Sequence, residues 1–146
     1  MKSFFCLLVM LVAPIARAGN ADVLSANELK AKVVEVADAQ NKVMLQGSTV
    51  ADVDALFSLY TDDFVYIHAA YGGTYTRDEL YRNTVRLLER GLYNKTEPRY
   101  TLISTIPGYE GIAVERQETH KGITSNHLAV FEFRDGKVSK IVEYWK

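Results

Sequence analysis

The stretch that decides the fold is Tyr60-Thr61-Asp62-Asp63-Phe64-Val65-Tyr66-Ile67-His68, in which an acidic turn leads into a strand over residues 64–69. Side chains alternate along a strand, so Phe64, Tyr66 and His68 share one face and the aliphatic residues between them share the other. The first face combines an aromatic ring, a phenol and an imidazole. We therefore predict that this face begins a small polar site in an apolar pocket.

Helical patterns lie on both sides of this stretch. Capping boxes of the form Ser/Thr-x-x-Glu begin at residues 25 and 76, where side chains can bind the free backbone N–H groups of a first helical turn. Apolar residues at helical spacing extend the first pattern and fill another pattern after residue 50. We therefore predict helices over residues 25–45, 50–60 and 76–91, the last closed by Gly91.

The second half of the chain has the alternation and turn residues of strands. The predicted strands cover residues 99–106, 112–120, 124–134 and 138–145, and a short return strand lies within residues 71–75. Charged residues on both faces of the segment 112–120 predict that this strand is partly exposed. Asp135-Gly136 is a strong signal for a two-residue hairpin. Helices followed by strands joined through short turns predict an α+β fold, with helices on one face of a curved antiparallel sheet.

The first 18 residues have the pattern of a secretory signal peptide. Lys2 gives a positive start, residues 4–15 are apolar, and Ala16-Arg17-Ala18 provides small residues for cleavage. The apolar run is shorter than the ~20 residues that a membrane-spanning helix needs. The alternative is a buried N-terminal helix. We predict cleavage after Ala18, a single domain over residues 19–146, and a periplasmic or secreted protein.

Charge and cysteine content argue against several classes of function. Loss of the leader leaves 15 basic and 18 acidic residues with no basic stripe, so nucleic acid is a poor candidate partner. The single cysteine, Cys6, lies in the leader, so the mature chain has neither a disulfide nor a thiol nucleophile. The sequence has no Gly-rich phosphate loop and no nucleophile elbow, and we expect no cofactor. We also expect no membrane association after cleavage.

The order of these elements resembles the nuclear transport factor 2-like superfamily, most closely its SnoaL-like and ketosteroid-isomerase-like branch. The resemblance rests on the helix and strand around Tyr60-Thr61-Asp62-Asp63, the helix start Thr76-Arg77-Asp78-Glu79, and the closing hairpin from Phe131 to Trp145. It implies a sheet that curls into a cone, closed by about three N-terminal helices around a mostly apolar pocket. The superfamily includes isomerases, cyclases and dehydratases as well as members without known activity, so the resemblance implies a fold more than a reaction.

His68 is the position at which the resemblance implies chemistry. It matches the strand position of the catalytic carboxylate in the ketosteroid isomerases, but the residue here is a histidine, which can act as a base near neutral pH. Tyr66 is the nearest candidate for a proton donor, and the alternative is that both residues only line the pocket. Tyr144 and Trp145 point to opposite faces of the last strand, and the sequence leaves open which of them faces the cavity. The predicted ligand contacts are Phe64, Tyr66, His68, His127, Phe131 and Trp145.

Two other clusters have simpler explanations than catalysis. Asp62 and Asp63 follow a helix, where Asp commonly binds the local backbone, and neighbouring side chains of an extended segment point apart. Glu118, His120 and His127 flank a turn, but they lack the spacing of a zinc site. We therefore predict no metal site in this chain.

Two of the predicted strands are apolar on both faces. Leu128 and Val130 are the outward neighbours of an aromatic inner row, and Val65 and Ile67 repeat this arrangement in the key strand. A sheet with one solvated face alternates more cleanly between apolar and polar residues. We therefore predict a homodimer in which a second copy covers the outer face of the sheet.

Three functions compete at this point. The first is an exported pocket protein that binds a small apolar or aromatic molecule. The second is acid/base catalysis of the isomerase, dehydratase or cyclase type, with His68 as the base. The third is a non-catalytic interaction role for the dimer. The sequence shows no carboxylate dyad, metal motif or cofactor loop, and this favours the first function.

Overall fold

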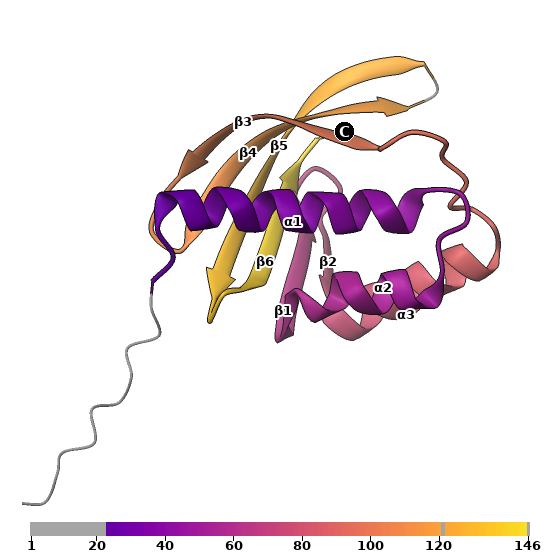
Figure 1. Ribbon diagram of the computed structural model, residues 1–146, viewed down its shortest axis with the longest axis horizontal. Helices are drawn as coiled ribbons and strands as arrows, with labels where there is room; N and C mark the ends of the chain where they lie inside the picture. Colours follow the sequence, from indigo (N-terminus) through magenta and orange to yellow (C-terminus); the bar gives the residue numbers. More distant parts are fainter. Residues whose placement is uncertain (1–22, 121, 146) are drawn as a thin grey trace, which may run out of the picture.

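The computed structural model describes residues 23–120 and 122–145, so the predicted signal peptide lies outside the described residues. The helices are α1 (Ala26–Met44), α2 (Val50–Ser58) and α3 (Arg77–Glu89). The strands are β1 (Tyr60–His68), β2 (Gly73–Thr76), β3 (Tyr100–Pro107), β4 (Gly111–His120), β5 (Ile123–Arg134) and β6 (Lys137–Tyr144) (Figure 1). Every predicted helix and strand is present, and the main difference is that β1 begins at Tyr60 rather than near Phe64.

The two predicted capping boxes fix the starts of α1 and α3. At α1 the Ser25 N–H donates to Glu28 at 2.7 Å, and the Glu28 N–H donates back to the Ser25 hydroxyl at 3.4 Å. The same exchange joins Thr76 and Glu79 at 2.9 and 3.3 Å. Gly91 ends α3 with a φ of 67°, a left-handed conformation that glycine adopts without steric strain.

The six strands form one sheet in the order β2-β1-β6-β5-β4-β3. Neighbouring strands are antiparallel except β1 and β6, which run parallel and pair Tyr66 with Ile141. The β5–β6 turn has positive φ at both Asp135 and Gly136, as a two-residue type I′ hairpin requires. The parallel contact was not predicted, because alternation assigns faces to a strand but does not name its neighbours.

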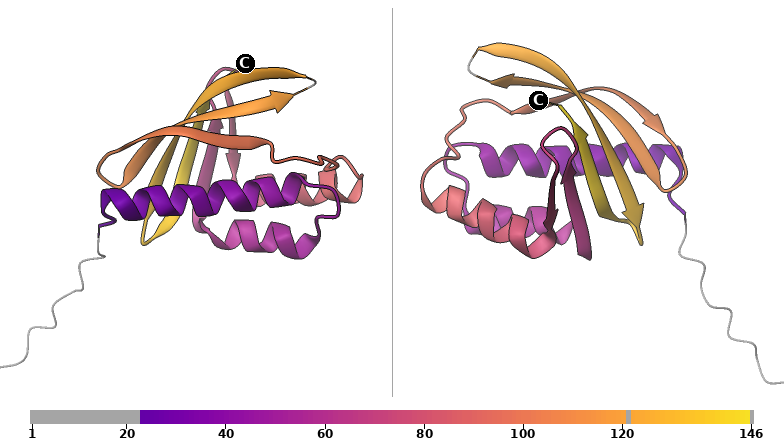
Figure 2. Two further views of the ribbon diagram at one scale, coloured as in Figure 1. Left: turned by 45° about the horizontal axis from the view of Figure 1, so that its top comes forward. Right: turned by 180° about the vertical axis from the view of Figure 1, so that it is seen from behind.

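The helices all lie on the concave face of this curved, open sheet. Figure 1 shows α1 crossing in front of the strands, with α2 and α3 beside β1 and β2, and the view from behind in Figure 2 shows the opposite sheet face without helices. Leu29, Val33 and Val36 of α1 form a buried core with inward residues of the sheet such as Phe131 and Ile141. No helix among residues 23–120 and 122–145 has the length and apolar character needed to cross a membrane.

Candidate ligand-binding cleft

A cleft with two parts lies between the helices and the inner face of the sheet. The deeper part, which we call the inner chamber, has a volume of about 150 Å³, and the outer part, the mouth, has a volume of about 760 Å³. The walls of the inner chamber include Val43, Met44, Leu56, Phe57, Tyr93 and Ile141. The walls of the mouth include His68, Tyr71, Tyr75, Arg86, Arg99 and Trp145. Tyr66, Leu80, Tyr100 and Glu143 line both parts and form the neck between them.

A buried carboxylate, Glu143, occupies the neck. It points inward because residues two apart on β6 share a face, and Ile141 is in the core. Its Oε1 accepts a hydrogen bond from the Arg116 guanidinium, and its Oε2 accepts from the Tyr66 hydroxyl at 2.7 Å and from the Trp145 indole N–H at 2.6 Å. Arg116 is 1% exposed and Glu143 is 3% exposed, so protein donors satisfy both oxygens of a fully buried charge.

Glu143 and Tyr66 hold each other in fixed protonation states. Burial alone would raise the pKa of the Glu143 carboxyl, but the Arg116 charge and the neutral donors outweigh burial, and this pKa lies below its usual value. Burial and the neighbouring Glu143 charge both raise the pKa of the Tyr66 hydroxyl. Glu143 is therefore a fixed anion and Tyr66 a fixed donor, and neither is a free acid or base.

A second set of charges lies on β4 and β5 and at Arg99, directly before β3. The Arg99 Nε donates to Glu118 Oε1 at 2.5 Å, and Glu118 Oε2 is 3.5 Å from the His127 Nδ1, without the geometry of a hydrogen bond. The His127 Nε2 shares a hydrogen bond of 2.8 Å with the Ser125 hydroxyl. Burial lowers the pKa of His127, and the attraction of Glu118 does not compensate for it. His127 is therefore a buried, neutral imidazole.

His68 lies in the wall of the mouth among aromatic rings. Its ring centre is 4.5 Å from the ring centres of both Tyr71 and Trp145, and Trp145 stacks on His127 at 4.8 Å. His68 is 7% exposed, and neither of its ring nitrogens has a hydrogen-bond partner among the described residues. An unpaired buried polar group is unfavourable, so a ligand atom that bonds to this imidazole would relieve that cost once a neighbouring ring moves to expose a nitrogen.

The cleft brings together some of the predicted contact residues and leaves others out. Tyr66, His68 and Trp145 line the mouth. Phe64 and Phe131 are in the hydrophobic core and line neither part of the cleft, because helices pack directly on that part of the inner face. His127, which we predicted at the rim, lies behind Trp145. Trp145 faces the cleft and Tyr144 is 51% exposed, which answers the question that the sequence left open.

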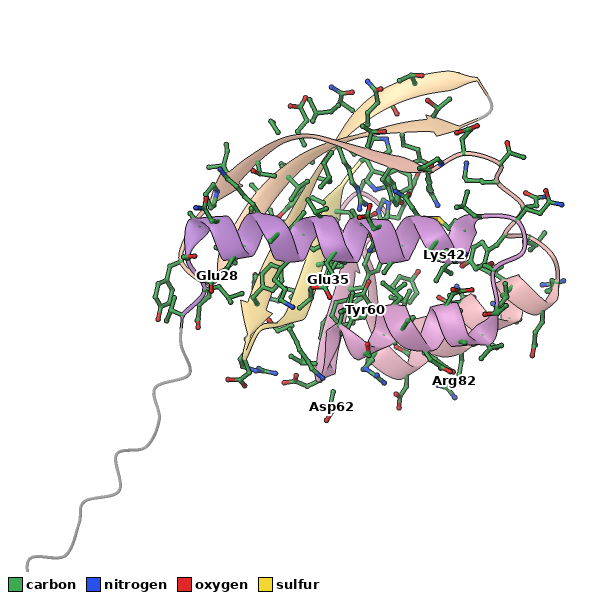
Figure 3. The ribbon with its side chains drawn as sticks, in the orientation of Figure 1. Glu28, Glu35, Lys42, Tyr60, Asp62 and Arg82 are labelled. Atoms are coloured by element: carbon green, nitrogen blue, oxygen red, sulfur yellow. The ribbon has the colours of Figure 1, made fainter. Side chains whose placement is uncertain are left out.

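The acidic pair Asp62 and Asp63 lies far from the cleft. Both side chains are exposed at the outer end of β1, where Asp63 pairs with Arg134, and Figure 3 shows Asp62 directed away from the body of the molecule. Among the residues that the structure describes, no group of three His, Cys, Asp or Glu side chains is placed to hold a metal ion. The side chain of His120 lies outside the described part of the chain.

Sequence reasoning missed Glu143 of the neck and the two buried charged residues of β4, Arg116 and Glu118. We predicted a partly exposed strand from the charges on both faces of β4, and Glu115 and Gln117 on its outer face are partly exposed, but Arg116 and Glu118 on its inner face are only 1% and 3% exposed. Both have the inward phase of Val114, which is in the core, just as Glu143 has the inward phase of Ile141. A charged residue in the inward phase of an otherwise apolar strand is the signal that would have identified this site.

Comparison with known proteins identifies the fold of this chain. No protein-family model and no curated protein matches the sequence. A nuclear transport factor 2-like protein of unknown function from Burkholderia pseudomallei matches with a TM-score of 0.58 at 18% identity, over 84% of this chain and 92% of that chain. A cystatin-fold protein from Novosphingobium aromaticivorans matches with a TM-score of 0.60 at 15% identity, over 81% and 97% of the two chains. TerC, co-crystallised with polyporic acid, matches with a TM-score of 0.57 at 14% identity, over 82% and 92%.

This chain has the nuclear transport factor 2-like fold. The resemblance seen in the sequence is confirmed at the level of the fold, and identities this low establish no reaction. In this nuclear transport factor 2-like cone, His68 occupies the β1 position that the resemblance relates to the isomerase carboxylate. The carboxylate of the neck is instead that of Glu143 on β6. Glu143 is the register partner of His68 in the parallel pairing of β1 with β6.

Proposed function

We propose that this protein binds a small apolar or aromatic molecule in the cleft, and that a polar atom of this ligand hydrogen-bonds to His68. The observation that carries the proposal is the state of His68. It lines the mouth, it is buried, and its ring nitrogens have no partner among the described residues. An imidazole that has lost its hydration in this way gains most from a ligand that replaces the missing bond.

The walls of the cleft support an apolar or aromatic ligand. Tyrosine and tryptophan rings line the mouth together with polar and charged side chains, and aliphatic and aromatic side chains form most of the inner chamber. Binding sites for small molecules are typically apolar cavities with a few convergent polar groups. TerC, which shares the fold, was co-crystallised with polyporic acid, and this supports the inclusion of organic acids among the compounds to be tested.

Acid/base catalysis with His68 as the base is the second candidate. The unpaired nitrogens of His68 favour it, since a base needs a free lone pair, but both nitrogens are buried, so a substrate reaches them only when a neighbouring side chain moves. The Tyr66 hydroxyl, however, donates to Glu143 and has a raised pKa, and both Glu143 oxygens are already bonded. Neither Tyr66 nor Glu143 is therefore a free acid or base beside His68, and binding without chemistry is the better explanation.

The experiment is a thermal-shift screen of the chain from residue 19 against small apolar and aromatic metabolites, followed by calorimetry of any hit. His68→Phe keeps a ring against Trp145 but removes both nitrogens, so we expect it to bind the hit about tenfold more weakly. The matched control is His127→Phe, which changes the same residue type behind Trp145, outside the cleft lining. We expect that control to keep most of the affinity.

Three outcomes separate the candidates. A hit weakened in His68→Phe, and recovered unchanged after incubation with the protein, supports binding. A hit that is converted to a product, with conversion lost in His68→Phe, supports catalysis instead. Failure of every compound to stabilise the protein contradicts both and favours a purely structural or interaction role.

We also propose that the protein is exported, on the signal-peptide pattern of residues 1–18, and that it belongs to the SnoaL-like type. Mass spectrometry of the protein recovered from a secreting host tests the export proposal. A mature chain that begins at Gly19 supports it, and an intact Met1 in the cytoplasm contradicts it.

We further propose a homodimer through the outer face of the sheet. Leu128 and Tyr144 are register partners on that face and are 46% and 51% exposed, and Ile67 pairs with Val142 beside them. A second copy of the chain offers the same apolar surface, so a two-fold axis would pair it with itself.

A further inference from the structure

The inner chamber limits the size of the group that can enter it. Its volume is about 150 Å³, and aliphatic and aromatic side chains such as Val43, Leu56, Phe57 and Ile141 form much of its wall. An apolar protein cavity of about 150 Å³ stays dry and takes up benzene. A single six-membered ring therefore fits this chamber, whereas a fused two-ring system would have to extend through the neck into the mouth.

The carboxylates of the mouth have little hydrogen-bonding capacity left for a ligand. Both Glu143 oxygens are bonded to Arg116, Tyr66 and Trp145. The Glu79 Oε2 accepts from the Thr76 N–H and from its hydroxyl, both at 2.9 Å, in the capping box of α3. Among the described residues, the carboxylate oxygen of the mouth that has no hydrogen-bond donor is Glu79 Oε1, which belongs to an exposed side chain.

The arginines of the mouth retain donors. The Arg86 Nη2 donates to the Asn83 side chain at 2.6 Å, and among the described residues its Nε and Nη1 have no hydrogen-bond partner. Arg99 donates from Nε to Glu118 and from Nη1 to the Met44 sulfur, and within the same residues its Nη2 has no partner. The unused capacity of the mouth therefore favours a ligand that carries acceptors.

The helix geometry places these donors close to the neck. Leu80 of the neck and Asn83, which holds the Arg86 guanidinium, are three residues apart on α3. At a rise of 1.5 Å per residue they are separated by roughly 4.5 Å along the helix axis. A short tail of two or three carbons attached to a ring in the chamber spans this length.

We infer that the cleft is specific for a single-ring aromatic compound with a short tail that ends in a carboxylate. The ring occupies the inner chamber, the tail passes the neck, and the carboxylate accepts hydrogen bonds from Arg86 and Arg99 in the mouth, with His68 beside it. This inference rests on the proposed function and narrows its ligand to one chemical class.

The test is titration calorimetry with a matched series of probes. 3-Phenylpropanoate has the ring and the anion, 3-phenylpropanamide has a neutral tail, phenethyltrimethylammonium has a cationic tail, and 3-(2-naphthyl)propanoate has a fused ring. We expect 3-phenylpropanoate to bind about tenfold or more tightly than the amide, as the loss of a charged hydrogen bond predicts. The cation and the naphthyl acid should bind more weakly still.

A pair of variants on α3 tests the position of the anion. Arg86→Gln should weaken 3-phenylpropanoate about tenfold and leave the amide unchanged. The control is Arg82→Gln, one turn earlier, whose side chain is exposed and directed away from the cleft (Figure 3). It should change neither affinity, and thermal unfolding of both variants checks that they remain folded.

The possible results separate this inference from the proposed function. Equal binding of the acid and the amide, preference for the cation, or equal binding of the naphthyl acid would overturn the inference. So would failure of the whole series while other compounds of the screen bind, and in that case the proposed function stands. Failure of the series together with the entire screen overturns both.

Discussion

Burial of the Glu143 carboxylate carries a desolvation penalty of several kcal/mol, which the Arg116 charge and the bonds from Tyr66 and Trp145 offset. The same three contacts fix the orientation of the Tyr66 hydroxyl and the Trp145 indole, which form walls of the cleft. Glu143 thus determines the shape of the site. Its contribution to the stability of the fold depends on the Arg116 charge.

Removal of the Glu143 charge while the Arg116 charge remains should be strongly destabilising. Glu143→Gln keeps the size of the side chain but leaves the buried Arg116 guanidinium without a counter-ion, so we expect urea denaturation to show a loss of about 3 kcal/mol in unfolding free energy. The control is Glu132→Gln, which breaks a half-exposed pair with Lys140 and should lose less than about 1 kcal/mol. Equal losses in the two variants would contradict this account.

His127 gives the stability a pH dependence of predictable sign. Burial lowers its pKa in the folded chain below the ordinary value of 6.5, so between these two pKa values the unfolded chain binds more protons. Stability is therefore greatest above pH 6.5 and decreases as the pH falls toward the folded pKa. The carboxyl groups with lowered pKa values, such as Glu143, titrate below this window.

We expect His127→Phe to reduce the slope of unfolding free energy against pH between about pH 5.5 and 7.5. The slope is the relevant quantity, because the substitution also removes the bond to Ser125 and so lowers stability at every pH. Urea denaturation of both proteins at three pH values measures it. An unchanged slope in the variant would assign the dependence to other groups.

At the scale of elements, one side chain of α1 takes the place of a strand at the edge of the sheet. Asn41 is buried, its amide N–H donates to the Tyr100 carbonyl at 2.9 Å, and its carbonyl accepts from the Tyr100 N–H at 2.9 Å. An edge strand otherwise presents unpaired backbone groups. This pair of bonds anchors the start of β3 to α1 and positions the Tyr100 ring at the neck.

Asn41→Leu should therefore leave both backbone groups of Tyr100 buried and unpaired. We expect a loss of about 2 kcal/mol or more in unfolding free energy, because each unsatisfied group is penalised by about 1–3 kcal/mol. Amide hydrogen exchange should also become faster at Tyr100. Asn126→Leu, an exposed asparagine on β5, is the control, and its loss should stay below about 0.5 kcal/mol. Unchanged exchange at Tyr100 would refute the anchoring role.

The elements that the sequence predicted are those with local causes. The capping boxes at Ser25 and Thr76 and the Asp135-Gly136 turn each depend on residues within four positions of one another, and the structure confirms all three. The neck depends on residues 66, 116 and 143, which come from three strands. Their meeting follows from the parallel pairing of β1 with β6, and local patterns contain no information about that pairing.

At the scale of the whole molecule, the outer sheet face carries an apolar row across five strands. Ile67, Val142, Val130, Ala113 and Ile106 are successive register partners on β1, β6, β5, β4 and β3. Ile106 is 73% exposed, and the three helices lie on the opposite face (Figure 2). Contiguous apolar surface of this kind commonly marks an interface, and a row of this kind can face its own copy across a two-fold axis.

Substitution at the centre of this row should separate the proposed dimer without unfolding the chain. Val142→Lys places a charge between Ile67 and Val130. In the monomer this ammonium group stays hydrated, whereas in a dimer interface without water it would be buried without a partner. Sedimentation analysis should show twice the chain mass for the parent protein and one chain mass for the variant.

The control is Gln117→Lys, on the outer face of β4 beside Asn126. It adds the same charge to a polar part of that face and should remain dimeric. Because the cleft opens on the opposite face, calorimetry should find ligand affinity unchanged in both variants. A parent protein with the mass of one chain would rule out the dimer.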